Sequence, residues 1–260
     1  MSLVHNLLIE DGLINLVYEI PHMLQWGTPI DVSEYMQWSN YNRNILKGQK
    51  KVDISNCVTV MPMAGQGSRF SKEGYEVPKP CIPVNGSLMF SQALKCLPNT
   101  NDIIFASLKS HKNLFNLEDY GKVVWLDDVL EGQACTTERI INHISNPNMS
   151  ILVSACDNGI LYDSDKFLNL VNDFDNDIIV WSYRNNFTSF RNPNAYSWLD
   201  VDDENIIRKV NVKDYRGVNP LDEFICWGTP NDLKTYEYWQ TFFNKVNWHP
   251  YEYEKDYFTN

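Results

Sequence analysis

Short apolar runs and longer amphipathic stretches alternate along most of the chain. The apolar runs are bounded by turn residues and rich in β-branched side chains, as buried strands are. They are Cys57–Met61, Ile103–Ala106, Val123–Trp125, Ile151–Ala155 and Ile178–Trp181. Helical periodicity follows several of them, over Leu88–Cys96, Gln133–Ile144 and Asp165–Phe174. This alternation predicts an α/β fold with a mostly parallel central sheet and helices on both faces.

Two further segments refine this organisation. Tyr196–Val201 and Ile206–Val212 are joined by polar residues and predict a β-hairpin. The stretch Leu46–Lys51 is polar and basic between two structured segments, which is typical of a linker. We therefore place a domain boundary at this stretch.

A segment near the N-terminus is repeated near the C-terminus. Residues 26–38 and 227–239 are identical at seven of thirteen positions and lie 201 residues apart. Each copy follows an apolar strand, Leu16–Tyr18 or Phe224–Trp227, and predicts a helix with Thr as N-cap, Pro at the first position and Asp at the third. The spacing is about the size of one α/β domain. The chain thus has the last strand and helix of two domains but room for one whole domain.

The composition excludes several classes of protein. Hydrophobic residues make up 43% of the 260 residues, which argues against a largely disordered chain. The formal net charge of −11 argues against nucleic-acid polymers or anionic lipid as partners, while a local cationic pocket for a small anion remains compatible with it. The sequence shows no apolar stretch near the ~20 residues of a membrane span and no secretion signal, so we expect a cytoplasmic protein.

Candidate chemistry follows the first apolar strand. The small residues Ala64–Ser68 form a loop whose glycines allow backbone N–H groups to approach a phosphate chain. The spacing fits neither the dinucleotide-binding G-x-G-x-x-G motif nor the P-loop. Arg69 directly follows the loop, and Lys79 lies between two prolines that stiffen its backbone. Two fixed cations beside a glycine loop indicate a phosphate-binding site.

Five motifs occur in order between residues 56 and 245. They are Met63-Ala64-Gly65-Gln66-Gly67-Ser68-Arg69 with Pro78-Lys79-Pro80, Glu131-Gly132-Gln133-Ala134-Cys135-Thr136, Ser154-Ala155-Cys156-Asp157-Asn158, the hairpin ending Val212-Lys213, and Trp227-Gly228-Thr229-Pro230-Asn231-Asp232-Leu233. In this order they resemble the sugar-1-phosphate nucleotidyltransferases, or nucleotide-sugar pyrophosphorylases, and look closest to capsule- and surface-polysaccharide members. The resemblance implies a Rossmann-like three-layer αβα nucleotidyltransferase fold.

The resemblance also implies roles for particular residues. The nucleotide would be bound by Met63, Ala64, Gly65, Gln66, Gly67, Ser68, Arg69, Lys79, Glu131 and Gly132. The catalytic residues would be Arg69, Lys79 and Asp157, with Mg²⁺ on Asp157 and the acceptor on Asn158 and Lys213. General chemistry agrees for Asp157, because the ends of apolar strands in open α/β sheets bind ligands and Mg²⁺ takes few protein ligands beside substrate phosphates.

Some of these residues also have a purely structural interpretation. Asp157 is compatible with a cap of the turn before Gly159, and Lys213 with a solvated surface lysine. The pair Glu131-Gly132 is compatible with the turn that leads into the following helix. The sequence leaves these alternatives open.

The implied reaction is in-line attack by a phosphate oxygen of the acceptor on the α-phosphorus of a nucleoside triphosphate, with release of pyrophosphate. Such a reaction needs no protein nucleophile. Catalysis would consist of positioning and of charge stabilisation by Mg²⁺, Arg69 and Lys79.

The sequence departs from the family pattern in two places. The family commonly has a second metal-binding Asp two residues before the Gly of the last motif, where this chain has Cys226 and the first copy of the repeat has Gln25. Asp222 or Glu223 is the alternative second ligand. Only residues 214–222 separate the hairpin from the last strand, where family members usually carry further elements of the acceptor pocket.

These observations predict the organisation of the chain. Residues 1–46 resemble the closing helix, strand and helix of an upstream nucleotidyltransferase-like domain, followed by a linker over 47–55, a nucleotidyltransferase domain over 56–245 and a tail over 246–260. We expect residues 4–46 to pack on the main domain or on a dimer mate, which makes a homodimer or a tandem-domain partner part of the prediction.

The predicted function is nucleotidyl transfer to a small phosphorylated acceptor. One alternative is a degenerate nucleotide-binding domain that supports a catalytic partner domain, which Cys226 and the short acceptor region favour. A third interpretation is a different doubly wound nucleotide binder, such as a dinucleotide enzyme, although the third glycine of that motif is missing.

Overall fold

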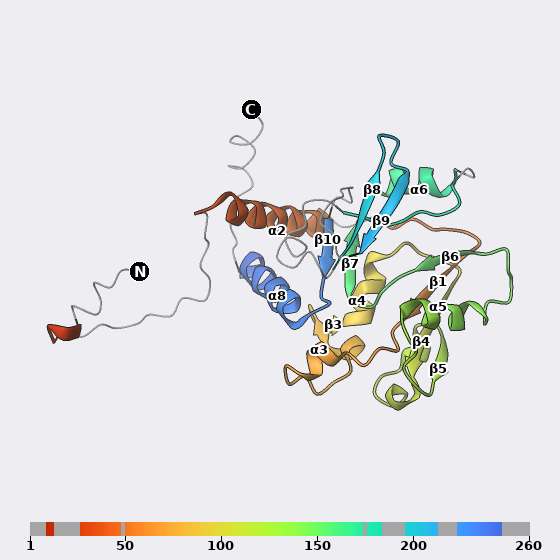
Figure 1. The fold of residues 1–260 in the computed structure, drawn as a ribbon, viewed down its shortest axis with the longest axis horizontal. Helices are drawn as coiled ribbons and strands as arrows, with labels where there is room; N and C mark the ends of the chain where they lie inside the picture. The colour runs from red at the N-terminus through yellow and green to blue at the C-terminus, as the bar shows by residue number, and fades with distance from the viewer. Residues whose placement is uncertain are drawn as a thin grey trace.

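Four parallel strands form the main sheet of the computed structural model, at the right in Figure 1. The structure describes residues 9–12, 27–47, 50–173, 176–183, 196–212 and 223–245. The strand order is β5-β4-β1-β6, with bounds β1 Cys57–Pro62, β4 Asp102–Leu108, β5 Lys122–Leu126 and β6 Ser150–Val153. The predicted parallel sheet is therefore confirmed.

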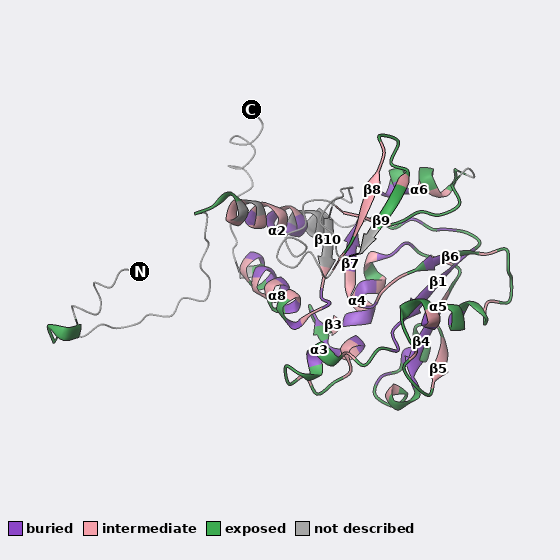
Figure 2. Cartoon of the chain, viewed as in Figure 1, coloured by how far each residue is buried: buried purple, intermediate pink, exposed green. Residues whose placement is uncertain are grey.

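The central strand β1 is buried on both faces (Figure 2). Val58 and Val60 belong to one apolar cluster with Ile140 of helix α5, Gln133–Ile141. Met61 points to the other face and belongs to a larger cluster with Phe90 of helix α4, Met89–Cys96. Alternate side chains of a strand point to opposite faces, so helices on both sides of this sheet complete three layers. The predicted three-layer fold is confirmed.

A second, antiparallel pair of strands follows the edge strand β6. Strand β7, Asn158–Leu161, pairs with β10, Glu223–Cys226, so that Asn158 lies opposite Cys226. Glycine at position 159 makes room for Trp227, because a Cβ there would lie 3.1 Å from the Trp227 ring. The predicted strand Ile151–Ala155 ends early, at Val153, and β7 was not predicted at all. The pairing depends on a strand far away in the sequence, which periodicity does not show.

Short elements connect the main ones. They are α3 Ser68–Ser71, η1 Lys79–Cys81, β2 Pro83–Val84, β3 Ser87–Leu88, η2 Lys109–His111, η3 Leu117–Asp119 and α6 Ser164–Val171. The predicted hairpin is confirmed as β8 Ser197–Val201 paired with β9 Ile207–Val212. The predicted strand Leu16–Tyr18 and the tail 246–260 lie outside the described residues.

The predicted strand Ile178–Trp181 was wrong. These residues have no regular structure, and Ile178 is 82% exposed. Trp181 instead packs on α6, with its ring centroid 4.4 Å from that of Phe167. An apolar run that places one aromatic side chain on a helix has the same composition as a short buried strand, which explains the error.

The repeated segments form two long helices that begin alike. Helix α2 covers Pro29–Lys47 and helix α8 covers Pro230–Lys245. Thr28 Oγ1 accepts from the backbone N–H of Asp31 and donates to its carboxylate, and Thr229 does the same with Asp232. These reciprocal caps satisfy N–H groups that the first turn leaves unpaired. Both predicted helix starts are confirmed, and α2 packs alongside α8 (Figure 1).

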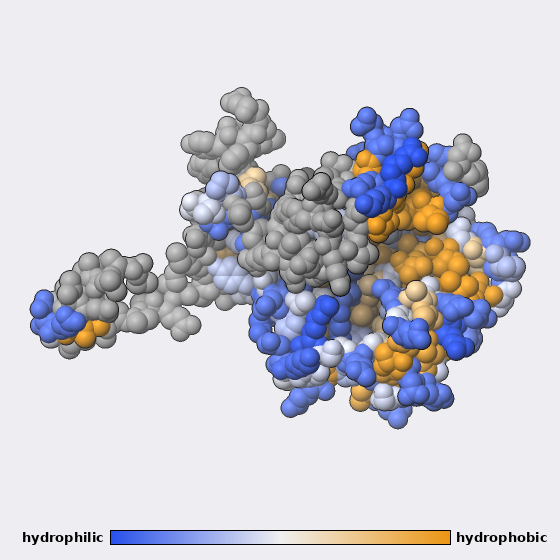
Figure 3. All heavy atoms as spheres, viewed as in Figure 1, coloured by the Kyte–Doolittle hydropathy of each residue, from blue (hydrophilic) through white to orange (hydrophobic). Residues whose placement is uncertain are grey.

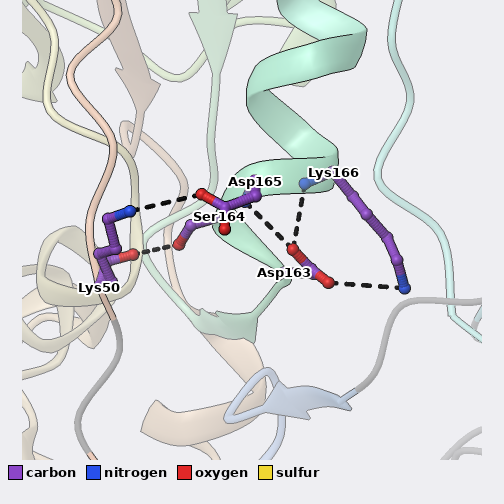
Figure 4. A network of polar contacts seen from close by, with 5 residues as sticks. All are labelled: Lys50, Asp163, Ser164, Asp165 and Lys166. Carbon is purple, nitrogen blue, oxygen red and sulfur yellow. Dashed lines mark hydrogen bonds and ion pairs between the residues drawn. The ribbon is translucent and has the colours of Figure 1, made fainter.

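A network of polar contacts joins the start of α6 to residue 50 (Figure 4). The Asp163 carboxylate accepts from the backbone N–H groups of Asp165 and Lys166, as an N-cap does. Ser164 donates its hydroxyl to the carbonyl oxygen of Lys50, and the Lys50 ammonium lies 3.3 Å from Asp165. Those backbone bonds lower the pKa of Asp163. This network fixes the chain just before it enters the core at Val52 and Ile54, which are buried.

Apolar side chains gather on the surface over the edge strand β6 (Figure 3). Ile151 and Val153 of this strand are 39% and 46% exposed. Among the helices of the described ranges, none has the length and apolarity that crossing a membrane requires.

Candidate active site

The topology of the sheet indicates where a ligand binds. The chain runs from β1 outward to β4 and β5, and then returns through α5 to β6 on the other side of β1. The direction of winding therefore reverses between β1 and β6. Open α/β sheets bind ligands at the carboxyl ends of the strands beside such a reversal. The loop 63–67 follows β1 directly and the segment 154–157 follows β6.

A pocket of about 490 Å³ opens at this place. It is lined by Pro62, Met63, Ala64, Gly65, Gly67, Ser68, Arg69, Phe70, Lys79, Pro80, Val129, Leu130, Glu131, Gly132, Gln133, Thr136, Ala155, Cys156, Asp157 and Gly228. The lining comes from five separate stretches of the chain. The volume lies in the range of small-molecule and cofactor sites.

Lys79 is held rigidly at the wall of this pocket. It begins the single turn η1 between Pro78 and Pro80, and the N–H of Cys81 donates to the Pro78 carbonyl over 2.8 Å. The loop after β1 presses against the base of its side chain, because a Cβ on Gly67 would lie 3.0 Å from Lys79 Cβ. Gly67 also has φ +62°, a left-handed conformation that favours glycine. The two motifs thus fix each other's position.

An ion pair joins Lys79 and Asp157, which both line the pocket. Lys79 Nζ donates to Asp157 Oδ2 over 2.5 Å, and each side chain is 20% exposed. Burial by itself disfavours the ammonium, but attraction to Asp157 outweighs it and raises the pKa of Lys79 above its ordinary value. The ammonium also lies 5.8 Å from the centre of the Phe70 ring. Lys79 is therefore a permanent cation at neutral pH.

The end of β10 and the start of α8 hold Asp157 from the other side. The backbone N–H of Trp227 donates to the Asp157 carbonyl over 2.8 Å. Gly228 lies so close that a Cβ there would be 3.2 Å from Asp157 Oδ2. The second copy of the repeat therefore supplies part of the wall around the carboxylate.

Two thiols adjoin the ion pair and stay protonated. Burial raises the pKa of Cys226 to about 12, and the charge of Asp157 shifts it in the same direction. Burial likewise raises the pKa of Cys156 to about 12. Both are poor ligands for a hard cation such as Mg²⁺, since a thiol is a soft ligand that binds as thiolate.

The structure brings most of the predicted site residues together. The pocket lining includes Met63, Ala64, Gly65, Gly67, Ser68, Arg69, Lys79, Glu131, Gly132 and Asp157. Gln66 is exposed and lies outside the lining, and Asn158 lies beside Asp157 in the β7–β10 ladder, also outside it. Glu223 pairs with Leu161, at the opposite end of this ladder from Cys226. Lys213 and Asp222 lie outside the described residues.

Sequence reasoning missed the apolar part of the pocket. Val129 and Leu130 come directly before the predicted Glu131-Gly132 pair, and Phe70 directly after Arg69. Apolar side chains show no catalytic or binding chemistry in a sequence. Only their position next to a motif pointed to the pocket. Gly228 was named within the repeat, but its approach to Asp157 depends on the β7–β10 pairing.

The donor set at the pocket fits a cation that needs few protein ligands. In the part of the chain that the structure describes, no three His, Cys, Asp or Glu side chains group together as a metal site. Asp157 offers one carboxylate in a pocket that also carries Lys79 and Arg69. This set fits Mg²⁺, which commonly binds through one or two carboxylates together with substrate phosphates.

Comparison with known proteins identifies the class of fold. The sequence matches no protein-family model and no curated protein. One similar solved structure is the inositol-1-phosphate CTP transferase from T. maritima, with 13% identity, a TM-score of 0.51 and coverage of 73% of this chain and 97% of that one. Another is a Bacillus anthracis protein assigned as a glucose-1-phosphate thymidylyltransferase, with 12% identity, a TM-score of 0.51 and coverage of 74% and 97%.

These similarities concern the fold. The chain has the Rossmann-like α/β fold seen in nucleotidyltransferases. Its pocket lies where that fold places ligands, at the reversal of the strand order.

Proposed function

We propose that this chain transfers a nucleotidyl group from a nucleoside triphosphate to a small phosphorylated acceptor, a sugar 1-phosphate, for surface-polysaccharide synthesis. The observation that carries the proposal is the half-buried Lys79–Asp157 pair in a pocket that the loop after β1 lines. Such a pair combines a fixed cation for a phosphate chain with a carboxylate for a metal ion. Its place at the strand-order reversal supports a nucleotide as the ligand.

The cations of the pocket would bind the triphosphate. Lys79 keeps its charge at neutral pH, and Arg69 carries a guanidinium that matches phosphate oxygens in a bidentate manner. The backbone of the loop 64–67 approaches the phosphates without side chains at Gly65 and Gly67. These groups would stabilise the negative charge that develops in the transition state.

The chemical step would exchange one phosphorus–oxygen bond for another. An acceptor phosphate oxygen forms a bond to the α-phosphorus, and the bond from that phosphorus to the bridging oxygen of the β-phosphate breaks. The electron pair leaves with pyrophosphate. An acceptor phosphate is already ionised at neutral pH, so no general base is required and the chain contributes position and charge.

Mg²⁺ belongs to the same proposal. Asp157 would hold it together with the phosphates, and the ion would supply neutralisation of phosphate charge when bound. Cys226 would not add a second ligand, because burial keeps its thiol protonated. The assignment of Asp222 or Glu223 as a second ligand, and of Asn158 and Lys213 to the acceptor, stays a prediction.

The base would lie against the segment after β5. Glu131 and Gly132 line the pocket with the apolar Val129 and Leu130. Gly132 precedes α5 in an extended conformation, with its carbonyl accepting from the Thr136 hydroxyl. An apolar wall next to a polar backbone segment suits a purine or pyrimidine ring.

A second candidate is a nucleotide-binding domain without catalysis. The protonated Cys226 beside Asp157, at the position where related enzymes commonly carry an aspartate, favours it. In this case the chain binds a nucleotide in the pocket but does not catalyse a reaction.

Pyrophosphate release tests both candidates. The full chain is incubated with each of the four nucleoside triphosphates, Mg²⁺ and a panel of sugar 1-phosphates and other phosphorylated acceptors. We expect release with at least one pair, and a loss of ~10²–10³ in rate for Lys79→Ala and Asp157→Ala. Lys72→Ala removes an exposed lysine just after α3 and is the matched control.

The outcomes separate the candidates. Nucleotide binding without release by the wild-type chain supports the non-catalytic domain. Near-normal release by folded Lys79→Ala contradicts the proposed role of the pocket.

A further inference from the structure

The contact between α2 and α8 has an internal symmetry. The repeat places Tyr35 of α2 at the same position as Tyr236 of α8, and Trp38 at the same position as Trp239. The ring centroids of Tyr35 and Trp239 are 6.0 Å apart with planes at 59°. Those of Trp38 and Tyr236 are 6.1 Å apart with planes at 57°. If α2 and α8 exchange places, the Tyr35–Trp239 contact becomes the Tyr236–Trp38 contact.

Such reciprocal contacts are typical of an interface with two-fold symmetry. In a symmetric dimer, residue i of one subunit contacts residue j of the other, and j contacts i. Here two segments of one chain reproduce that arrangement. The four rings are buried, Tyr236 completely and the others to 7% exposure, so they form part of the core and not a loose contact.

Both halves of the aromatic contact are present on α8 alone. Tyr236 and Trp239 lie on one face of this helix, which we call the α8 face and define by Tyr236, Trp239, Gln240 and Phe243. A second α8 would bring the same Tyr and Trp in reciprocal positions. The α8 face is thus complementary to itself.

Polar contacts make α2 a better partner than a second α8. The indole N–H of Trp239 donates to Glu34 over 3.2 Å, and the Gln240 amide donates to Asn42 over 3.1 Å. In α8 the position of Glu34 is taken by Thr235 and that of Asn42 by Phe243. The equivalent indole N–H of Trp38 is buried and has no hydrogen bond among the residues described.

We propose that the α8 face is a homodimerisation surface for a second copy of this chain, and that α2 covers it as an intramolecular competitor. The occupant follows from the repeat, because the reciprocal Tyr–Trp contacts need a helix with this spacing and α8 is such a helix. Two hydrogen bonds and the covalent tether favour α2 over the second copy. Release of α2 therefore exposes a surface that pairs with itself.

A release variant tests this directly. Tyr35→Ala with Trp38→Ala removes the aromatic residues of α2 and leaves α8 unchanged. Sedimentation velocity over a concentration series measures self-association of the full chain. We expect an association constant at least about tenfold above that of the wild type, as expected when a tethered competitor is lost. Asn40→Ala, on α2 but outside the reciprocal contacts, is the matched control and leaves association unchanged.

A gain-of-function variant distinguishes this dimer from non-specific association. Thr235→Glu places on α8 the carboxylate that α2 provides through Glu34, so each Trp239 gains a partner across the dimer. Added to the release variant, it tightens the dimer by about a hundredfold, because the symmetric dimer gains two charged hydrogen bonds. Further addition of Tyr236→Ala and Trp239→Ala abolishes the dimer.

Several results would overturn the proposal. The first is a folded release variant whose association constant equals that of the wild type. The second is an association constant that Thr235→Glu leaves unchanged. The third is a dimer that persists when Tyr236 and Trp239 are replaced by alanine. Circular dichroism establishes that each variant is folded. Where the release variant is not, Glu34→Ala with Asn42→Ala removes the two hydrogen bonds while keeping the rings, and raises association in the same direction by a smaller factor.

Discussion

At the scale of single residues, the two glycines of the first loop have different roles. Gly67 has φ +62° and leaves no space for a Cβ against Lys79. Gly65 has no atom within 4 Å of a Cβ position and faces the open pocket. Gly67 is therefore required by the fold, whereas a need for glycine at position 65 would come only from the proposed nucleotide.

Alanine substitution separates these roles. We expect Gly67→Ala to lower the free energy of unfolding by about 1–2 kcal/mol, since a left-handed alanine is strained and its methyl group displaces Lys79. Gly65→Ala leaves stability within about 0.5 kcal/mol and weakens nucleotide binding instead. Chemical denaturation and nucleotide titration measure the two effects. Equal loss of stability in both variants contradicts this assignment.

The charge of Lys79 sets the pH dependence of the site. Its pKa is raised in the folded chain, so the stabilisation from this pair is present below the ordinary lysine pKa and is lost only as the pH rises through the higher, folded value. We expect the stability difference between wild type and Lys79→Met to stay constant from pH 7 to about pH 9. Denaturation at both values measures it, and a difference that shrinks over this range argues against the ion pair.

At the scale of elements, the start of α8 connects helix capping to the site. The cap residue Thr229 follows Gly228, where a Cβ would lie 3.2 Å from Asp157 Oδ2, whereas the identical cap at Thr28 begins α2. The same local motif therefore has a structural role in one copy and also supports the site in the other.

Valine at the two caps provides a matched comparison. We expect Thr229→Val and Thr28→Val each to cost about 1 kcal/mol in stability, because a first-turn N–H loses its acceptor. Only Thr229→Val also slows pyrophosphate release, because it loosens the backbone beside Asp157. Thermal melts and the release assay are the measurements, and Thr229→Ser restores both. Equal activity of the two valine variants shows that the cap does not position Asp157.

At the scale of the whole molecule, α2 belongs to the same core as the sheet. Tyr35, Trp38 and Tyr41 share an apolar cluster with Met61 of β1 and Phe90 of α4. The helix N-terminal to the predicted linker thus contributes aromatic side chains to the main apolar core.

Truncation of Trp38 tests how far this contribution extends beyond the contact with α8. We expect Trp38→Ala to cost about 3 kcal/mol and to raise hydrogen exchange in α2 more than in β1, because the lost side chain packs on Tyr236 of α8 and holds α2 in place. Trp38→Phe keeps most of the aromatic area and costs less, since the Trp38 N–H has no hydrogen bond among the described residues to lose. Exchange that rises equally in β1 shows that α2 opens only together with the sheet and contradicts its release as a separate element.

Short-range sequence patterns were enough to predict most local elements and to name many of the residues that line the pocket. Alternating apolar runs identified the four parallel strands, and the Thr-Pro-x-Asp pattern identified two helix starts, because periodicity and capping depend on residues a few positions apart. Lys79, Arg69, Gly132 and Asp157 were all named from motifs, and the pocket gathers them.

The relations between distant segments could be seen only in the folded chain. The β7–β10 pair, the approach of Gly228 to Asp157 and the reciprocal packing of α2 on α8 join residues up to about two hundred positions apart. The failed strand at Ile178–Trp181 has the same cause. Strand pairing and helix packing depend on which surfaces meet after the chain folds, and a single sequence holds no local signal for that.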